Sequence, residues 1–356
     1  MLPEVRKLIQ ENQKLLYSFR KGGANLPKKQ KILLAEYLNE SFKTMSAKMQ
    51  LLKKHNIILD DNFVINSELA YFAGFYITEN EIEVELINFQ FEPVLEKIAP
   101  DFPHKVIFEG DDCLRILEDL VQKLWDIVPF VAGSIVFNKC MQYGENQNIA
   151  YYIKGNTFKI DDLSLMLNTL SSFLPEAFDN IVQVDAVLAY TLYLREKVFE
   201  SDSIVYYDLD DGRIGYVKHN ILSKESNPAS GLIFPRYTDK QKDTLKILEF
   251  LSDDQYEIQL DAIISTGILN IFDQATLQIR SLLNPQHFII DGKWVKEPYF
   301  YEFYRKSSQI FTTYNEIANH IYLECPWTVI MKKEEQPQKG AAIYAAYSFF
   351  DWELKW

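Results

Sequence analysis

The sequence predicts an α/β body built from two similar lobes, preceded by a small helical head of the winged helix-turn-helix type. The body is indicated by a strand–turn–strand pattern that occurs twice, beginning near Tyr71 and near Ser203, with helix and strand patterns after each copy. The head is indicated by helical apolar spacing between Leu2 and Leu52, and by a charge opposite in sign to that of the body.

Composition restricts the class of protein. A hydrophobic fraction of 47% in 356 residues is enough for large cores and for two or three domains. No apolar run approaches the roughly 20 residues that span a bilayer, and Met1–Gln10 lacks the apolar core of a signal peptide. We therefore expect a cytoplasmic protein with no membrane contact.

The chain has three cysteines, Cys113, Cys140 and Cys325. They match no zinc spacing, so no metal or cofactor is predicted.

Charge is distributed unevenly along the chain. The net charge is −13, yet Met1 to His55 holds twelve Lys and Arg against four Glu, a net +8, which leaves −21 for the remainder. A basic segment joined to an acidic body is typical of a nucleic-acid-binding module attached to another domain. A basic but merely solvated helical surface is the alternative.

Three helices are expected in the head. The first covers Leu2 to Phe19, the second begins at Pro27, and the third follows Ser41, whose hydroxyl can cap it. The apolar faces of the second and third helices are Leu34, Ala35, Leu38, Met45, Met49 and Leu52. Two short helices joined by a tight turn favour a helix-turn-helix, with an ordinary helical hairpin as the alternative.

The outward face of the third helix supplies the predicted DNA contacts. Such a helix enters the major groove with its N-terminal end, where lysines suit phosphates or guanine edges, and hydroxyls and amides suit bases or phosphates. The predicted DNA-binding residues are Ser41, Lys43, Thr44, Ser46, Lys48, Gln50, Lys53 and Lys54. After them, Ile57 to Asn66 predicts a wing hairpin, but its tip at Asp60-Asp61 is acidic and is assigned no contact.

The body is expected to alternate strands and helices. The predicted strands are Tyr71–Ile77, Ile82–Phe89, Phe130–Phe137, Ile181–Val184, Ser203–Leu209, Arg213–Lys218 and His287–Ile290, with others near Ile321 and Val329. The predicted helices are Cys113–Val128, Ile160–Phe173, Ala186–Lys197, Lys240–Leu251, Gln255–Leu283 and Lys339–Phe350. We expect a head over residues 1–66, a first lobe over 67–185 completed by 330–356, and a second lobe over 186–329, with a cleft between the lobes.

Several segments together resemble one family. They are YFAGFYITENEIEVELINF from Tyr71, VDAVLAY from Val184, SIVYYDLDDGRIGYVKHNIL from Ser203, LNPQHFIIDG from Leu283 and KGAAIYAAY from Lys339. In this order they resemble the ROK family (repressors, open reading frames and kinases), in its N-acetylglucosamine-repressor-like branch. The resemblance implies an actin-like sugar-kinase body of duplicated ribonuclease-H-like lobes behind a winged helix-turn-helix.

The motifs of the kinase branch are altered here. Phosphoryl transfer needs glycine turns that cradle phosphates, but the second hairpin has Asp211 and Arg213 where the family has small residues, and the first lacks its Gly-Thr pair. The family's zinc loop is absent. We therefore expect no enzymatic activity, with a divergent ATP-dependent carbohydrate kinase as the alternative.

Asp185 is the one predicted ligand-binding residue. It matches the family's catalytic base, yet Val184 and Val187 replace neighbours that would touch sugar, and valine cannot form hydrogen bonds through its side chain. An aspartate at the start of a helix can equally be a cap.

The resulting expectation is a transcriptional repressor of the ROK type. Its expected partners are double-stranded DNA, a second copy of the chain in a homodimer or homotetramer, and a carbohydrate-like effector in the cleft. A non-DNA-binding assembly protein is the remaining alternative, favoured by the acidic wing tip.

Overall fold

The computed structural model describes the chain in segments. The described residues are 1–22, 41–59, 64–78, 80–108, 113–137, 141–143, 149–153, 156–159, 181–199, 203–208, 213–218, 221–222, 278–279, 283, 285–291, 328–329 and 336–350. The chain forms two compact units, one of Met1–Tyr193 with Pro337–Trp356 and the other of Leu194–Gln336. Among the described helices, none has the length and apolar character needed to cross a membrane.

The first unit contains a five-stranded mixed sheet with the order β3-β2-β1-β4-β8. The hairpin pair β1–β2 and the pair β2–β3 are antiparallel, whereas β1, β4 and β8 run parallel to one another. The strands are β1 (Tyr71–Ile77), β2 (Glu81–Asn88), β3 (Lys105–Ile107), β4 (Ala132–Phe137) and β8 (Ile181–Asp185). The predicted hairpin and the predicted strands at Phe130–Phe137 and Ile181–Val184 are confirmed. The strand β3 was not predicted, because three residues carry too little pattern.

The second unit repeats this arrangement. Its sheet has the order β11-β10-β9-β12-β13, with β9–β10 and β10–β11 antiparallel and β9, β12 and β13 parallel. The strands are β9 (Ser203–Asp208), β10 (Arg213–Lys218), β11 (Ile221–Leu222), β12 (His287–Asp291) and β13 (Thr328–Val329). Strand for strand, order and direction match the first sheet, so the predicted duplication of an α/β unit is confirmed.

A third, smaller sheet was not predicted. It is antiparallel, with the order β5-β6-β7, and consists of β5 (Met141–Tyr143), β6 (Ile149–Ile153) and β7 (Asn156–Lys159). The expected helices at 160–173 and 240–251, the expected strand near Ile321, and nearly all of the expected helix at 255–283 lie outside the described residues.

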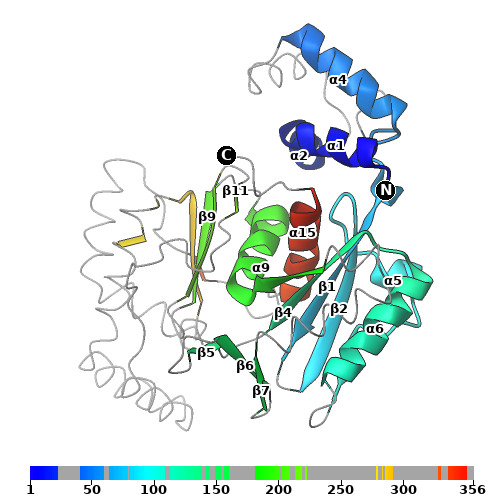
Figure 1. Ribbon diagram of the computed structural model, residues 1–356. Helices are drawn as coiled ribbons and strands as arrows, with labels where there is room; N and C mark the ends of the chain where they lie inside the picture. The colour runs from blue at the N-terminus through cyan, green and yellow to red at the C-terminus, as the bar shows by residue number, and fades with distance from the viewer. Residues whose placement is uncertain are drawn as a thin grey trace, which may run out of the picture. The chain divides into compact units, whose positions relative to one another are not determined.

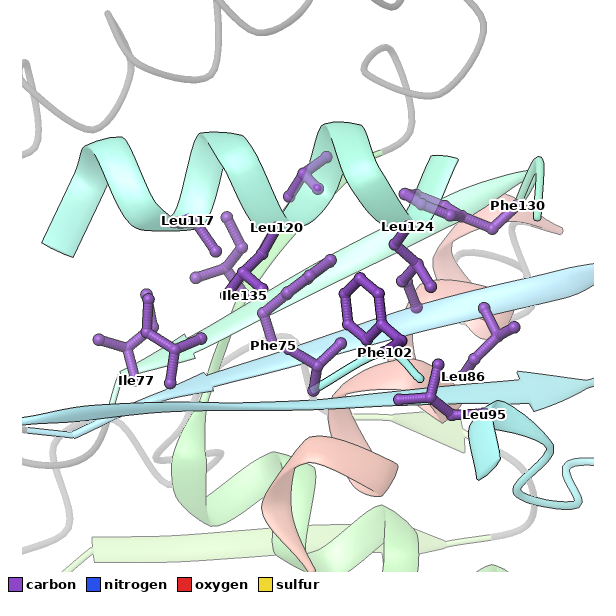
Figure 2. Close-up of a cluster of buried hydrophobic side chains, with 14 of the residues drawn as sticks. Phe75, Ile77, Leu86, Leu95, Phe102, Leu117, Leu120, Leu124, Phe130 and Ile135 are labelled. Atoms are coloured by element: carbon purple, nitrogen blue, oxygen red, sulfur yellow. The ribbon is translucent and has the colours of Figure 1, made fainter. Parts of the chain in front are cut away.

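One face of the first sheet packs against α6 (Cys113–Ile127), with α5 (Leu95–Ile98) at its side. Figure 2 shows Leu117, Leu120 and Leu124 of α6 pointing at the strands, where Phe75 and Ile135 meet them. Alternation along each strand sends the neighbouring side chains to the opposite face. Since deleting a buried leucine side chain costs about 2–5 kcal/mol, this core is a main source of the lobe's stability.

The opposite face packs against α9 (Ala186–Tyr193) and α15 (Pro337–Phe349) (Figure 1). Two glycines permit this packing. A Cβ on Gly74 of β1 would collide with the carbonyl of Gln338 and lie 2.6 Å from the nitrogen of Ala342, and a Cβ on Gly340 would collide with the carbonyl of Ala189. The chain around Lys339–Phe350 was predicted to be helical, and α15 confirms it.

The head begins with two helices where one was predicted. They are α1 (Pro3–Glu11) and α2 (Gln13–Gly22), and the break falls at Asn12. Asn12 ends α1 with a backbone N–H to Ile9 and a side-chain amide that donates to the carbonyl of Leu8 at 2.8 Å. Asparagine competes in this way for helix hydrogen bonds, which apolar spacing alone does not reveal. A 3₁₀ turn, Ser67–Leu69, leads from the head into β1.

Candidate nucleic-acid interface

The helix α4 (Phe42–Lys54) is the predicted recognition helix. Its N-cap is Ser41, whose Oγ accepts a hydrogen bond from the backbone N–H of Thr44 at 3.1 Å and lies 2.8 Å from the Thr44 hydroxyl oxygen. The predicted cap is therefore confirmed. The cap hydrogen bond satisfies one of the four N–H groups that a helix start leaves open. The helix that a helix-turn-helix requires before α4 falls within residues 23–40, outside the described residues, so the motif stays a prediction.

One side of α4 is buried. Met45 and Leu52 are fully buried and Met49 nearly so, as the apolar spacing predicted. Because these residues recur at helical spacing, the other side of the helix is left to solvent.

The solvent-facing side carries positive charge and no carboxylate. Of the residues predicted to bind DNA, Ser41, Lys43, Thr44, Gln50 and Lys54 are exposed. The remaining three, Ser46, Lys48 and Lys53, are half-buried and each makes an interaction within the chain. The sequence of α4 contains four lysines and no Asp or Glu. The structure thus gathers the predicted residues on one helix and its N-cap and leaves five of them exposed.

The hairpin after α4 has its predicted base. Ile58 and Ile65 form an antiparallel bridge, the N–H of Leu59 donates to the carbonyl of Val64 at 2.8 Å, and the N–H of Asn66 donates to the carbonyl of Ile57 at 2.9 Å. The acidic tip lies in residues 60–63, outside the described part. Ile57, Ile58 and Ile65 are buried, and the N–H of Ile57 donates to the carbonyl of Leu52, which joins the base of the hairpin to the end of α4.

Two of the head's basic residues are used inside the protein. The guanidinium of Arg6 donates to the carbonyl of Phe349 at 2.9 Å and lies 4.4 Å from the centre of its ring, and the guanidinium of Arg20 lies 3.8 Å from the centre of the Phe91 ring. Lys7 forms an i,i+4 ion pair with Glu11 at 3.9 Å. The net charge of the head therefore overstates the number of positive charges that can contact DNA. Sequence reasoning missed this because Arg6 and Arg20 have no motif that marks them as packing residues.

Asp185, the predicted ligand-binding residue, ends β8 and pairs in register with Phe137 of β4. The helix α9 begins at the next residue, Ala186. This is the position where an aspartate can cap the helix or face a ligand at the carboxyl end of parallel strands, so both interpretations stay open.

Glu85 is a second acid of the first unit, and the sequence pattern did not reveal its burial. It lies on the α15 side of β2, opposite Gly74, and is only 7% exposed. Burial raises its pKa, while the hydrogen bond from the N–H of Leu86 at 3.1 Å and the ammonium of Lys339 at 3.9 Å act in the opposite direction. Within the described segments, no group of three or more His, Cys, Asp or Glu is arranged to hold a metal ion.

Known structures identify the fold. A crystal structure described as a ROK family transcriptional regulator, homologous to the E. coli Mlc protein, superposes over 98% of this chain and 98% of its own, with a TM-score of 0.53 and 10% identity. The chain has the fold of the ROK proteins. The family resemblance inferred from the sequence is thus confirmed at the level of fold.

An enzyme also shares the ROK fold. The ROK hexokinase from Thermus thermophilus superposes over 79% of this chain and 99% of its own, with a TM-score of 0.50 and 12% identity. The part of the chain that the hexokinase covers is smaller than the part that the regulator covers. No family model and no curated protein matches the sequence.

Proposed function

We propose that this ROK-fold protein is a DNA-binding transcriptional repressor in which α4 is the recognition helix. The observation that carries the proposal is the outward face of α4, where Lys43, Thr44, Gln50 and Lys54 are exposed and no carboxylate interrupts them. Positive charge on one helix face provides the phosphate attraction that binding to a duplex requires, and polar groups between the lysines can reach base edges. The match to a regulator over nearly the whole chain supports the same function.

A selection for bound DNA tests the proposal. The full chain is incubated with a pool of random-sequence duplexes, and the Lys43→Glu/Lys54→Glu variant and the Lys123→Glu control are treated identically. Lys123 is an exposed lysine of α6, so its reversal adds the same kind of charge away from α4. We expect the wild type and the control to enrich duplexes and the α4 variant to enrich none. Equal recovery by all three proteins would refute DNA binding through α4.

Loss of kinase activity is a further part of the proposal. In the first hairpin, the N–H and hydroxyl of Thr78 both bond to the carbonyl of Glu81, at 2.9 and 3.3 Å. A phosphate cradle needs such donors directed outward. A rise in the unfolding temperature with ATP and Mg²⁺, above that with Mg²⁺ alone, would instead support the divergent carbohydrate kinase.

Effector control through Asp185 and self-association are the last parts of the proposal. If a carbohydrate-like ligand binds at the end of β8, Asp185→Asn should weaken the effect of that ligand on DNA affinity. The DNA affinity measured without the ligand should not change. A titration of the selected duplex, with and without a panel of sugars and sugar phosphates, measures this.

Sedimentation of the chain alone determines whether it forms the expected homodimer or homotetramer.

A further inference from the structure

The side chain of Asn88 forms hydrogen bonds that hold the turn that follows β2. The Oδ1 of Asn88 accepts hydrogen bonds from the N–H groups of Gln90 and Glu92 at 2.9 and 3.0 Å, and its Nδ2 donates to the Glu92 carboxylate at 3.1 Å. Backbone bonds from Asn88 to Glu92 and from Phe91 to Asn88 close the same turn. The turn is therefore a fixed platform at the end of the strand.

Phe91 holds an uncommon backbone conformation within this turn. Its φ is 64°, in the left-handed region that a bulky L residue rarely adopts. Its ring is buried, lying 3.8 Å from the guanidinium of Arg20 and 6.0 Å from the ring of Tyr347 in α15. A residue stays in this region only where its surroundings fix it, which makes such positions informative about function.

The same turn also touches the hairpin that follows α4. The side-chain amide of Gln90 donates to the carbonyl of Ile65 in that hairpin at 3.0 Å. The N–H of Phe89 donates to the carbonyl of Ser67, in the 3₁₀ turn that follows the hairpin, at 3.1 Å. The turn thus contacts the head at two separate places: α2 through Arg20, and the base of the hairpin through Ile65. A third contact, from Arg6 to Phe349, joins α1 to the end of α15.

We propose that the turn Asn88–Glu92 is the seat of the DNA-binding head, and that Phe91 and Arg20 are positioning residues that fix the direction of α4. This inference rests on the proposed function. Two heads linked in one oligomer bind two half-sites strongly only if their orientations match the DNA in advance. A loosened head still binds a single half-site, because its own contacts are unchanged, but the advantage of the second half-site is lost.

The experiment compares Arg20→Gln with the wild type on two DNA probes. One probe is the duplex enriched by the wild type from the random pool, and the other is the same duplex with one half-site scrambled. The matched control is Arg115→Gln, which changes an exposed arginine of α6. We expect Arg20→Gln to bind the intact duplex about tenfold more weakly, which corresponds to about 1.4 kcal/mol, and the single half-site as tightly as the wild type.

A second pair of variants separates positioning from simple damage. Phe91→Asn keeps a residue that tolerates the left-handed conformation but removes the ring, and it should reproduce the loss on the intact duplex. Arg20→Lys keeps a cation over the ring and should lose less than Arg20→Gln. Equal weakening on both probes, or no weakening on the intact duplex, overturns the positioning role.

A measurement without DNA keeps this inference distinct from the proposed function. If the wild type enriches no duplex, the proposed function fails. The seat is then judged from the distance distribution between spin labels at Gln50 in α4 and Asp119 in α6 of the full chain. A narrow distribution that broadens in Arg20→Gln, and not in Arg115→Gln, supports the seat. Equal widths in the wild type and Arg20→Gln overturn it.

Discussion

The helices α4 and α15 are both thirteen residues long, yet they differ in how much of their surface is buried. In α4, the buried side is formed by Met45, Met49 and Leu52, and the exposed side includes Lys43 and Lys54. In α15, glycine, alanine and aromatic residues predominate, and nine of the thirteen positions are buried. A helix that is apolar all round belongs to a core, whereas one with a single apolar side is available for another molecule. The helix α15 therefore holds the lobe together, whereas α4 is the helix proposed to contact DNA.

The largest effect is expected where α15 crosses α9. In Gly340→Val the new side chain must displace the backbone at Ala189, because a Cβ at this position already collides with that carbonyl. We expect the free energy of unfolding to fall by about 3 kcal/mol, measured by urea denaturation. The control Ser348→Ala, at a half-buried position of the same helix, should change it by less than about 0.5 kcal/mol. Similar stabilities for the two variants would show that this helix crossing is not tight.

A smaller and local effect is expected at the start of α4. Ser41→Ala removes the oxygen that accepts the Thr44 N–H, which should cost about 1 kcal/mol of helix stability. Amide hydrogen exchange within α4 should then speed up about fivefold, while amides of α6 stay unchanged. Exchange that speeds up equally in both helices would mean that α4 does not open independently of the lobe.

The sequence revealed these two helices unequally. The apolar spacing of Met45, Met49 and Leu52 was enough to place α4 and its buried side, and the hydroxyl of Ser41 indicated its cap. The helix α15 was located, but its position between β1 and α9 depends on Gly74 and Gly340, and a glycine in a sequence does not say which backbone approaches it. The duplicated sheets could be predicted because a strand–turn–strand pattern occurs twice in the sequence, from Tyr71 and from Ser203.

Other features could not be read from the sequence for a similar reason. The alternation of β2 placed its acidic residues on one face, but it could not show that α15 covers Glu85. Likewise, the packing of Arg6 and Arg20 against aromatic rings depends on contacts far apart in the chain. Both examples show that pattern predicts which face a residue occupies, and only tertiary structure shows what covers that face.

A still smaller effect concerns the buried carboxyl beneath α15. Because burial raises the pKa of Glu85 above its unfolded value, the native state favours the protonated form, and stability falls as the pH rises from the ordinary carboxyl range through the raised pKa. Glu85→Gln should therefore have a higher Tm than the wild type at neutral pH, and the difference should disappear below about pH 4. The control is Glu83→Gln, on the same face beside Lys105. A lower Tm for Glu85→Gln at neutral pH would mean that the contact with Lys339 outweighs the cost of burial.

The most direct test of the central claim is the salt dependence of DNA binding by Lys43→Gln. Lys43 is exposed on α4, so its replacement should leave the Tm unchanged. If α4 lies against a duplex, the slope of log affinity against log salt concentration should fall by about 0.9, the loss of one phosphate contact. An affinity and a salt slope both equal to those of the wild type would contradict the assignment of α4 as the DNA-binding helix.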